Sequence, residues 1–310
     1  MKQVKNIFNG KNAFQSIDLN DISRPIADKE RVQLQNILVE MYRDILTYCQ
    51  KKGWTPYLVG GSALGAIRHK GFIPWDDDLD VGMLRDEYEK FITEFEIEYG
   101  SKYIVNSPGK SQTAKVRFTK VLKRNTVFKE LNAIDNDDLN CIFVDIFPID
   151  NVPNNKIVRV MKGIYADCLA YISSQVFNYY NRNAKLIEAL KRTGKLNYSV
   201  RMFTGCLFGV KKPDWWFQKY DDVVRCKDDN STYCTISAGR KHYFGEMIER
   251  SKIVPAQYIE FSGIQAPVFR NVESYLSNMY GNYMEIPPIK KREQHYIQEL
   301  SFDTVNDLEK

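Results

Sequence analysis

The chain of 310 residues is long enough for one large domain or two ordinary ones, and its 44% hydrophobic and 27% charged residues are typical of a folded globular protein. Its net charge of +5 favours anionic partners such as nucleotides or phosphorylated glycans, but without a basic motif it is too small to indicate a nucleic-acid-binding protein. The six scattered cysteines lack the short spacing of a zinc site and the N-terminus lacks the apolar stretch of a signal peptide, so we expect a cytoplasmic protein with free thiols, either in solution or in peripheral contact with the inner face of the membrane.

The first elements of the chain are predicted by hydrophobic period and by glycine. Residues 1–26 are polar and aperiodic, which predicts a loosely held arm. A helix that ends at Gly53 follows, because apolar residues recur with the helical period at positions 34, 37, 38, 41, 45 and 48. Residues 57–59 predict a short buried strand, which leads through two glycines into a short helix over 62–68.

The two glycines at this strand-to-helix turn, Gly60 and Gly61, indicate an anion site. The N-terminus of a helix carries N–H groups without intrahelical partners and the positive end of the helix dipole, and both favour a phosphate. The Ser62 hydroxyl can donate as well. A Walker loop is excluded because Ala66-Ile67 stands where it needs lysine and then serine or threonine, and the glycine spacing does not fit the dinucleotide fingerprint. The basic run after the turn, which either stabilises a bound diphosphate or is simply solvated, consists of Arg68, His69 and Lys70.

An acidic cluster follows the basic run, with aspartates at positions 76, 77, 78 and 80. Two carboxylates about 4 Å apart repel by roughly 4 kcal/mol at an effective dielectric near 20, so the cluster is either solvated or bound to a cation. Leu79 and Val81 alternate with Asp78 and Asp80, which predicts a half-buried strand over 78–83 with both carboxylates on one face, about 6.6 Å apart. That spacing suits Mg²⁺ or Mn²⁺. A calcium-binding EF-hand is excluded, because Val81 replaces its glycine and a proline forbids the helix before its loop.

A third carboxylate is predicted on the most apolar strand, over 141–146, which we expect in the centre of the sheet. An ionised Asp145 among Ile, Phe and Val is costly unless it is paired or bound to a metal, so it either joins the acidic cluster from a neighbouring strand or is a satisfied structural group. The remaining predicted elements are an acidic helix over 85–99, strands over 103–106 and 115–122, some strand within 232–268, and helices over 156–182, 185–192, 199–209, 214–225 and 271–280.

Together these motifs resemble a known family. Gly-Gly-Ser on a strand-to-helix turn, an Asp-x-Asp strand and a later carboxylate strand resemble the nucleotidyltransferase fold. Within that fold, GGSALGAIRHKGFIPWDDDLDVGM (residues 60–83) and FVDIFPID (143–150) look like the LicD family. Tyr275-Leu276, MYGNYMEIPP (279–288) and Arg292-x-x-His295 are similar to the C-terminal motif of that family, although Asn282 stands where an acid is common.

The resemblance implies a fold and an activity. We expect an α+β protein with a nucleotidyltransferase-like mixed sheet over 27–150, a mostly helical region over 151–300 packed on it to bind donor or acceptor, and a tail over 301–310. LicD proteins transfer phosphocholine from CDP-choline to sugars of teichoic acid, lipopolysaccharide or capsule, and fukutin-type relatives use CDP-ribitol. The resemblance therefore implies a CDP-alcohol donor, a glycan or lipid-linked sugar acceptor, and in-line attack by a sugar hydroxyl with release of CMP.

The resemblance also assigns roles to residues of this chain. Asp78, Asp80 and Asp145 match the metal-binding carboxylates, and Asp76 is an additional ligand. One of the first three also accepts the hydroxyl proton, for which Asp145 is best placed. The phosphate turn matches Gly60, Gly61 and Ser62, and the substrate-facing candidates are Trp75, Arg292 and His295, the last two about one turn apart if helical.

Two other functions stay open at this point. Nucleotidyl transfer from a nucleoside triphosphate would use a similar site and release pyrophosphate instead of CMP. A non-catalytic scaffold that binds glycans or nucleotides is disfavoured by the intact aspartate set.

Overall fold

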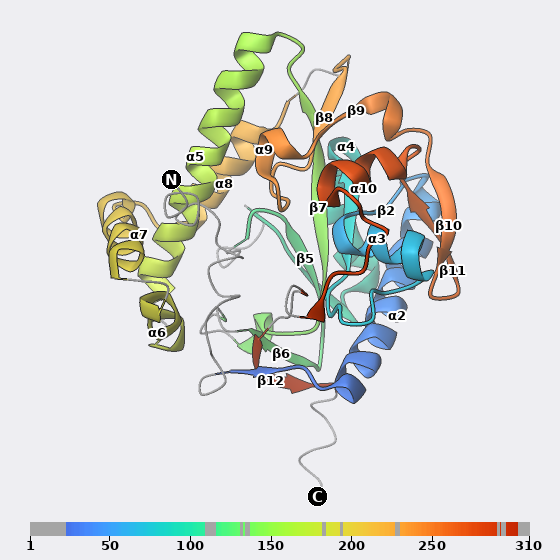
Figure 1. Ribbon diagram of the computed structural model, residues 1–310, viewed down its shortest axis with the longest axis horizontal. Helices are drawn as coiled ribbons and strands as arrows, with labels where there is room; N and C mark the ends of the chain where they lie inside the picture. Colours follow the sequence, from blue (N-terminus) through green and yellow to red (C-terminus); the bar gives the residue numbers. More distant parts are fainter. Residues whose placement is uncertain are drawn as a thin grey trace, which may run out of the picture.

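A computed structural model of the chain describes residues 23–108, 116–130, 133, 137–181, 184–192, 195–226, 230–289, 292 and 296–302. It shows an α+β protein, as predicted, with a mixed sheet at its centre and a group of helices beside it (Figure 1). Within these residues, no helix combines the length and apolar character needed to cross a membrane.

The central sheet has the strand order β2-β3-β7-β5-β4. Its longest strand, β7, lies between β3, which runs parallel to it, and β5, which runs antiparallel, so the predicted central place of the apolar strand is confirmed. β8 pairs with the far end of β7, and β9 pairs with β8. The strands are β2 (Tyr57–Leu58), β3 (Asp80–Leu84), β4 (Tyr103–Asn106), β5 (Thr119–Lys123), β7 (Phe143–Val152), β8 (Tyr233–Thr235) and β9 (Met247–Glu249).

The helices of the first half are α2 (Asp28–Lys52), α3 (Gly60–His69) and α4 (Arg85–Tyr99). α2 ends at Gly53, as the sequence predicted, because this glycine adopts a left-handed conformation with φ of 74° and caps the helix. The apolar face of α2 packs on α4 through aromatic rings, with the ring centroid of Tyr48 5.2 Å from that of Phe95. The predicted acidic helix over 85–99 is confirmed.

Four helices of the second half, α5 to α8, form a group beside the sheet, on the left of Figure 1. α5 packs on both α7 and α8, and its first turns project past the sheet at the top of the view. α10 lies against α3 and so reaches the predicted phosphate turn. The bounds are α5 (Lys156–Asn181), α6 (Ala184–Arg192), α7 (Lys195–Phe208), α8 (Pro213–Val224), α9 (His242–Gly245) and α10 (Val272–Tyr280).

Two smaller sheets complete the fold. One has the strand order β1-β12-β6 and the other is a hairpin of β10 and β11. The pairing of β1 with β12 and the burial of Ile26 attach residues 23–26, the last of the predicted arm, to the body of the protein. The strands are β1 (Arg24–Pro25), β6 (Val127–Glu130), β10 (Gln257–Phe261), β11 (Ile264–Val268) and β12 (Tyr296–Ser301).

The structure corrects the predicted boundaries at two places near the acidic cluster. β3 begins at Asp80, so Asp78 lies in the preceding loop and does not share a strand face with Asp80. α3 begins at Gly60, so both glycines belong to its first turn instead of a turn before the helix. In both cases the local pattern was right, but the hydrogen bonds that define the element begin elsewhere.

Candidate active site

The N-terminus of α3 lies directly against two carboxylates of the acidic cluster. A Cβ atom at Gly60 would be 2.8 Å from Oδ2 of Asp80, and one at Gly61 would be 2.8 Å from Oδ2 of Asp76. Gly60 also has a φ of 53°, which favours glycine. The glycines therefore make room for carboxylates, at the helix end where negative charge is stabilised.

Hydrogen bonds hold this contact in place. The backbone N–H of Asp80 donates to Oγ of Ser62 at 2.8 Å, and the N–H of Gly60 donates to the hydroxyl of Tyr275 at 3.0 Å. The side-chain amide of Gln35 donates to the carbonyl of Asp76 at 2.8 Å. Ser62 is buried, so in this structure its hydroxyl orients the start of β3.

Three consecutive aspartates form a candidate cation site. One carboxylate oxygen from each of Asp76, Asp77 and Asp78 lies within 4.8 Å of the others. Carboxylate oxygens gathered in this way fit Mg²⁺ or Mn²⁺, which bind through a few carboxylates and complete their shell with water and phosphate. Asp77 is buried and was not among the predicted ligands. Its position between Asp76 and Asp78 was the signal available in the sequence.

The predicted third carboxylate lies beside the cluster. Asp145 and Asp80 are register partners in the parallel pair of β3 and β7, so their side chains share one face of the sheet. Sequence reasoning missed Lys120, the partner of Asp145 on β5, whose Nζ lies 3.4 Å from the Asp145 carboxylate. The predicted adjacency of the two carboxylate strands is confirmed, with an ammonium group next to Asp145.

Residues 53–185, from the C-terminal cap of α2 to the start of α6, match the family model described as the LicD/FKTN/FKRP nucleotidyltransferase domain. Over these residues the chain is similar to the LicD family. It is 28% identical over 258 residues to the lipopolysaccharide cholinephosphotransferase LicD of Haemophilus influenzae, an alignment that covers 81% of this chain and 90% of that protein.

Two other relatives are similar to shorter parts of this chain. An uncharacterised protein of Rickettsia typhi is 28% identical over 88 residues, which are 26% of this chain and 27% of that protein. An uncharacterised protein of Rickettsia prowazekii is 36% identical over 62 residues, 20% of this chain and 22% of that protein.

The basic run of the LicD motif ties α3 to the C-terminal segment. Arg68 donates to the carbonyl of Tyr283 at 2.7 Å, and its Nε donates to His69 at 2.9 Å. Burial lowers the pKa of Arg68, and burial together with the charge of Arg68 lowers the pKa of His69. Lys70, by contrast, is exposed and ends α3 in a left-handed conformation. Arg68 therefore fixes the position of the segment after α10.

Trp75 lies next to Arg292, the other substrate-facing candidate that the structure describes, and also next to Arg68. The guanidinium of Arg292 lies 4.1 Å from the centroid of the Trp75 ring, and that of Arg68 lies 6.0 Å from it. Arg292 lies in a bend, and His295, which would lie one turn away if the segment were helical, is outside the described residues. A choline group bound to Trp75 would compete with these guanidinium groups.

Further residues of the C-terminal half reach the site without having been predicted. Burial, followed by the charge of Asp80, raises the pKa of Tyr280, and the guanidinium of Arg240 lies 6.0 Å from its ring centroid. Glu246 is 3% exposed, and burial raises its pKa to about 7, although it accepts a hydrogen bond from the N–H of Lys241 at 3.0 Å. The LicD-like C-terminal motif was a signal for Tyr275 and Tyr280, whereas no pattern pointed to Arg240 or Glu246.

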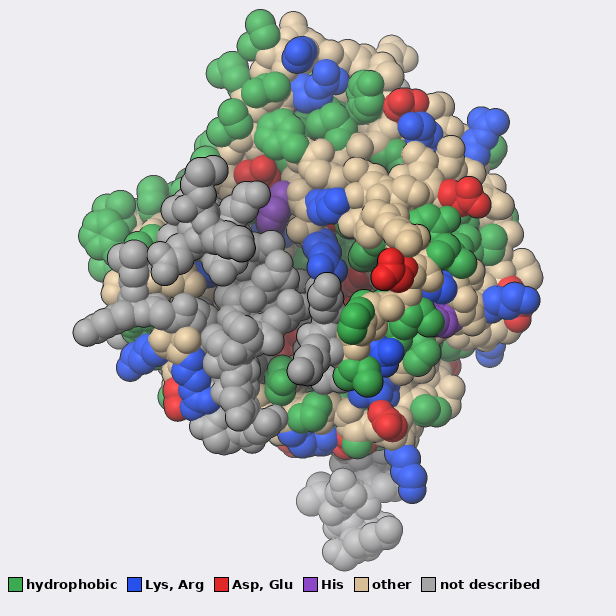
Figure 2. Space-filling model, in the orientation of Figure 1, with side chains coloured by type: hydrophobic (Ala, Val, Ile, Leu, Met, Phe, Trp, Pro, Cys, Tyr) green, Lys and Arg blue, Asp and Glu red, His purple; other side chains and the backbone are tan. Residues whose placement is uncertain are grey.

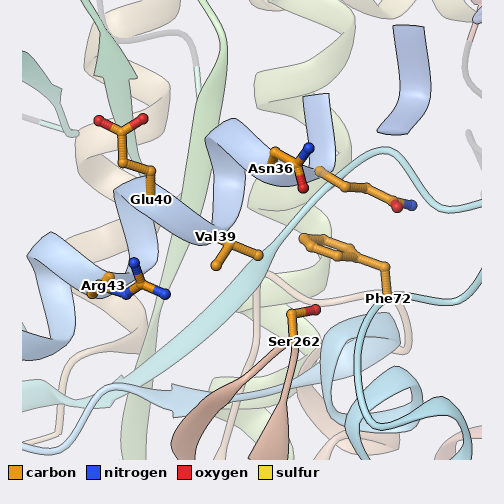
Figure 3. Close-up of a pocket in the computed structure, with 7 residues that line it drawn as sticks. Asn36, Val39, Glu40, Arg43, Phe72 and Ser262 are labelled. Atoms are coloured by element: carbon orange, nitrogen blue, oxygen red, sulfur yellow. The ribbon is translucent and has the colours of Figure 1, made fainter. Parts of the chain in front are cut away.

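A pocket of about 390 Å³ lies on another side of the acidic loop. Figure 3 shows Val39 of α2, Phe72 of the loop after α3 and Ser262 of the β10–β11 hairpin pointing toward one another. None of the predicted site residues lines this pocket. Gln35, which does line it, donates a hydrogen bond to the carbonyl of Asp76. We therefore assign the chemistry to the acidic cluster and not to this pocket.

Proposed function

We propose that this protein, which is similar to the LicD family, transfers a phospho-alcohol, with phosphocholine as the first candidate, from a cytidine diphosphate ester to a sugar of a bacterial surface glycan. The observation that carries the proposal is the contact of Asp76 and Asp80 with the glycine-containing N-terminus of α3. This contact supports the proposal, because the residues predicted to bind phosphate lie against two of the carboxylates predicted to bind the cation. The name of the Haemophilus influenzae relative, which aligns over most of both chains, supports phosphocholine as the group and lipopolysaccharide as the first acceptor to test. Teichoic acid and capsule are the other acceptors we propose, and we place the reaction in the cytoplasm.

The proposal includes a divalent metal ion, Mg²⁺ or Mn²⁺. The carboxylates of Asp76, Asp77 and Asp78 would hold it, with Asp80 and Asp145 on the neighbouring face of the sheet. The gathered oxygen ligands fit such an ion, because without a cation they would repel one another. When bound, the ion supplies charge neutralisation for the diphosphate.

The residues of the chain would bind and orient the two substrates. The N–H groups in the first turn of α3, at Gly61 and Ser62, would hold the phosphate of the donor. Asp145, positioned beside Lys120, would take the proton from the attacking sugar hydroxyl as the bond from phosphorus to the CMP oxygen breaks. Tyr280, whose ionisation the charge of Asp80 opposes, would line the donor site together with Arg240, whose guanidinium lies 6.0 Å from the centroid of the Tyr280 ring.

Nucleotidyl transfer is the second candidate, because the matched family model is itself described as a nucleotidyltransferase domain. In that reaction the protein would use a nucleoside triphosphate, leave a nucleotide on the acceptor and release pyrophosphate.

Thermal unfolding in the presence of candidate donors tests the proposal. CDP-choline with Mg²⁺ should raise the melting temperature more than CMP does, and EDTA should cancel the shift. A ligand at about 100 times its Kd adds roughly 2.7 kcal/mol, which a melting curve resolves easily. Stabilisation by CDP-ribitol or CDP-glycerol but not by CDP-choline would keep the reaction class and remove choline. Stabilisation by nucleoside triphosphates alone would favour nucleotidyl transfer.

A further inference from the structure

The first turns of α5 expose an apolar stripe. Five large side chains, spaced so that they share one face of the helix, are between 40% and 72% exposed: Ile157, Val160, Met161, Ile164 and Tyr165. The opposite face is the one that packs on the protein, since Gly163 and Ala166 are buried there. Soluble proteins rarely expose so many apolar side chains together without a partner.

The packed side of α5 is covered in part by Phe244 of α9, whose ring lies against Gly163. The stripe lies on the part of α5 that projects past the sheet in Figure 1, and Figure 2 shows hydrophobic side chains gathered at that end of the molecule. Because the stripe lies at a projecting end of the molecule, its five side chains can all contact one broad surface together.

The charge of the helical region favours an anionic partner. Residues 156–225 contain 13 Lys and Arg against 5 Asp and Glu, a net charge of +8, whereas the rest of the chain carries −3. Around the stripe itself, residues 156–166 contain no acid, and Lys156 is exposed next to Ile157, whereas Arg159 lies over the ring of Tyr233 and Lys162 donates to the carbonyl of Arg225. An apolar helix face in a basic region is the pattern of a helix that lies in the interface of a membrane with anionic lipids.

We infer that the exposed face of α5 docks the protein on an anionic lipid bilayer. The apolar side chains enter the boundary between headgroups and acyl chains, and the basic residues contact the anionic headgroups. A second copy of the chain fits this face less well, because a symmetric contact would bring two regions of +8 together. The inference does not depend on which group the protein transfers.

Co-sedimentation of the full chain with lipid vesicles tests this inference. The wild-type protein should pellet with vesicles that contain about one-third phosphatidylglycerol and stay in solution with phosphatidylcholine alone. The double variant Met161→Glu/Ile164→Glu should lose at least about tenfold in vesicle affinity, because it places two carboxylates in the apolar stripe. The matched control is Val32→Glu/Ile97→Glu, which makes the same change at exposed positions of α2 and α4 and should bind like the wild type.

Three results would overturn the inference. The first is that the wild-type protein does not bind anionic vesicles, and the second is that the two double variants bind them equally well. The third is that the wild-type protein forms a dimer and binds no vesicles, and that Met161→Glu/Ile164→Glu dissociates this dimer. Both double variants should keep the wild-type thermal response to CDP-choline with Mg²⁺, since neither changes the acidic cluster. A failure of membrane docking is thereby distinguishable from a failure of the proposed transfer.

Discussion

Gly61 shows how a single missing side chain shapes the site. Its backbone is not in the left-handed region, so Gly61→Ala has a small conformational cost, but the new Cβ would collide with Oδ2 of Asp76. We expect Asp76 to move, with weaker metal binding and at least about a tenfold loss of rate, equivalent to 1.4 kcal/mol, while the melting temperature changes little.

The control for this change is Gly263→Ala. Gly263 has a φ of 77° and no atom within 4 Å of its Cβ position, so the substitution should cost about 1 kcal/mol of stability and leave the rate unchanged. Metal titration and steady-state rates of the two variants measure the difference. A Gly61→Ala protein with wild-type metal affinity would show that the contact with Asp76 is incidental.

The aspartates themselves make the second residue-level prediction. Asp78→Ala and Asp80→Ala should each remove more than about nine-tenths of the rate, a loss of transition-state stabilisation above 1.4 kcal/mol, because Asp78 belongs to the proposed cation site and Asp80 is the adjacent carboxylate on the sheet face beside it. The metal-free variants should be at least as stable as the wild type, since the cluster repels itself. Asp86→Ala, an exposed acid in the first turn of α4, is the control for rate. If either cluster variant turns over as fast as Asp86→Ala, that carboxylate is not a ligand.

At the scale of elements, a buried ion network joins the helical half to the sheet. Nε of Arg85, at the start of α4, lies 2.7 Å from Asp150 of β7, and its Nη1 lies 2.9 Å from Asp221 of α8. All three are buried. Arg85→Met should cost about 3–5 kcal/mol, because it leaves the fully buried Asp150 without its cation and removes one of the two guanidinium partners of Asp221, which keeps Arg225 at 2.7 Å.

Urea unfolding of Arg85→Met measures this cost. The triple variant with Asp150→Asn and Asp221→Asn should recover part of it, since no buried charge then remains. If the free energy of unfolding of Arg85→Met is within about 1 kcal/mol of that of the wild type, water reaches this network.

The loop between β8 and β9 carries a pH-dependent prediction through Glu246. Because burial raises its pKa to about 7 from 4.5, the folded protein prefers the protonated form. The stability gained from that proton is complete below about pH 4.5 and is lost as the pH rises through 7. Glu246→Gln keeps a neutral side chain at every pH, so the variant should match the wild type at about pH 5 and exceed it by at most about 3 kcal/mol at about pH 8.

Urea unfolding in EDTA at the two pH values measures this difference. A gap between variant and wild type that is the same at both would mean that Glu246 does not titrate on unfolding.

The elements that could be predicted are those with a local signal. The helical period and Gly53 predicted α2, the acidic segment predicted α4, and the apolar run predicted the central place of β7 in the sheet. β12 could not be predicted, because it is a strand by virtue of pairing with β1 and β6, which lie far away in the sequence. The start of β3 was misplaced for a related reason, since alternation of Asp with Leu and Val continues into the loop before the strand.

At the scale of the whole molecule, the candidate site is assembled from segments that only the fold brings together. The glycines and aspartates of one motif could be placed from the sequence, as could Asp145 on a neighbouring strand. Lys120 could not, because its place beside Asp145 follows from the register of β5 on β7. Arg240 and Glu246 come from a loop whose position depends on the packing of α10, and no local pattern encodes that.

The measurement that tests the central claim most directly is a transfer assay with CDP-choline labelled in the choline group and lipopolysaccharide that lacks phosphocholine. The account predicts that label enters the glycan in equal amounts with the CMP released, that EDTA stops both, and that Mg²⁺ or Mn²⁺ restores both. Asp80→Ala should release no CMP. The account would be contradicted by two results together. They are the transfer of no label from CDP-choline or any other CDP-alcohol, and the release of pyrophosphate from a nucleoside triphosphate with a nucleotide left on the acceptor.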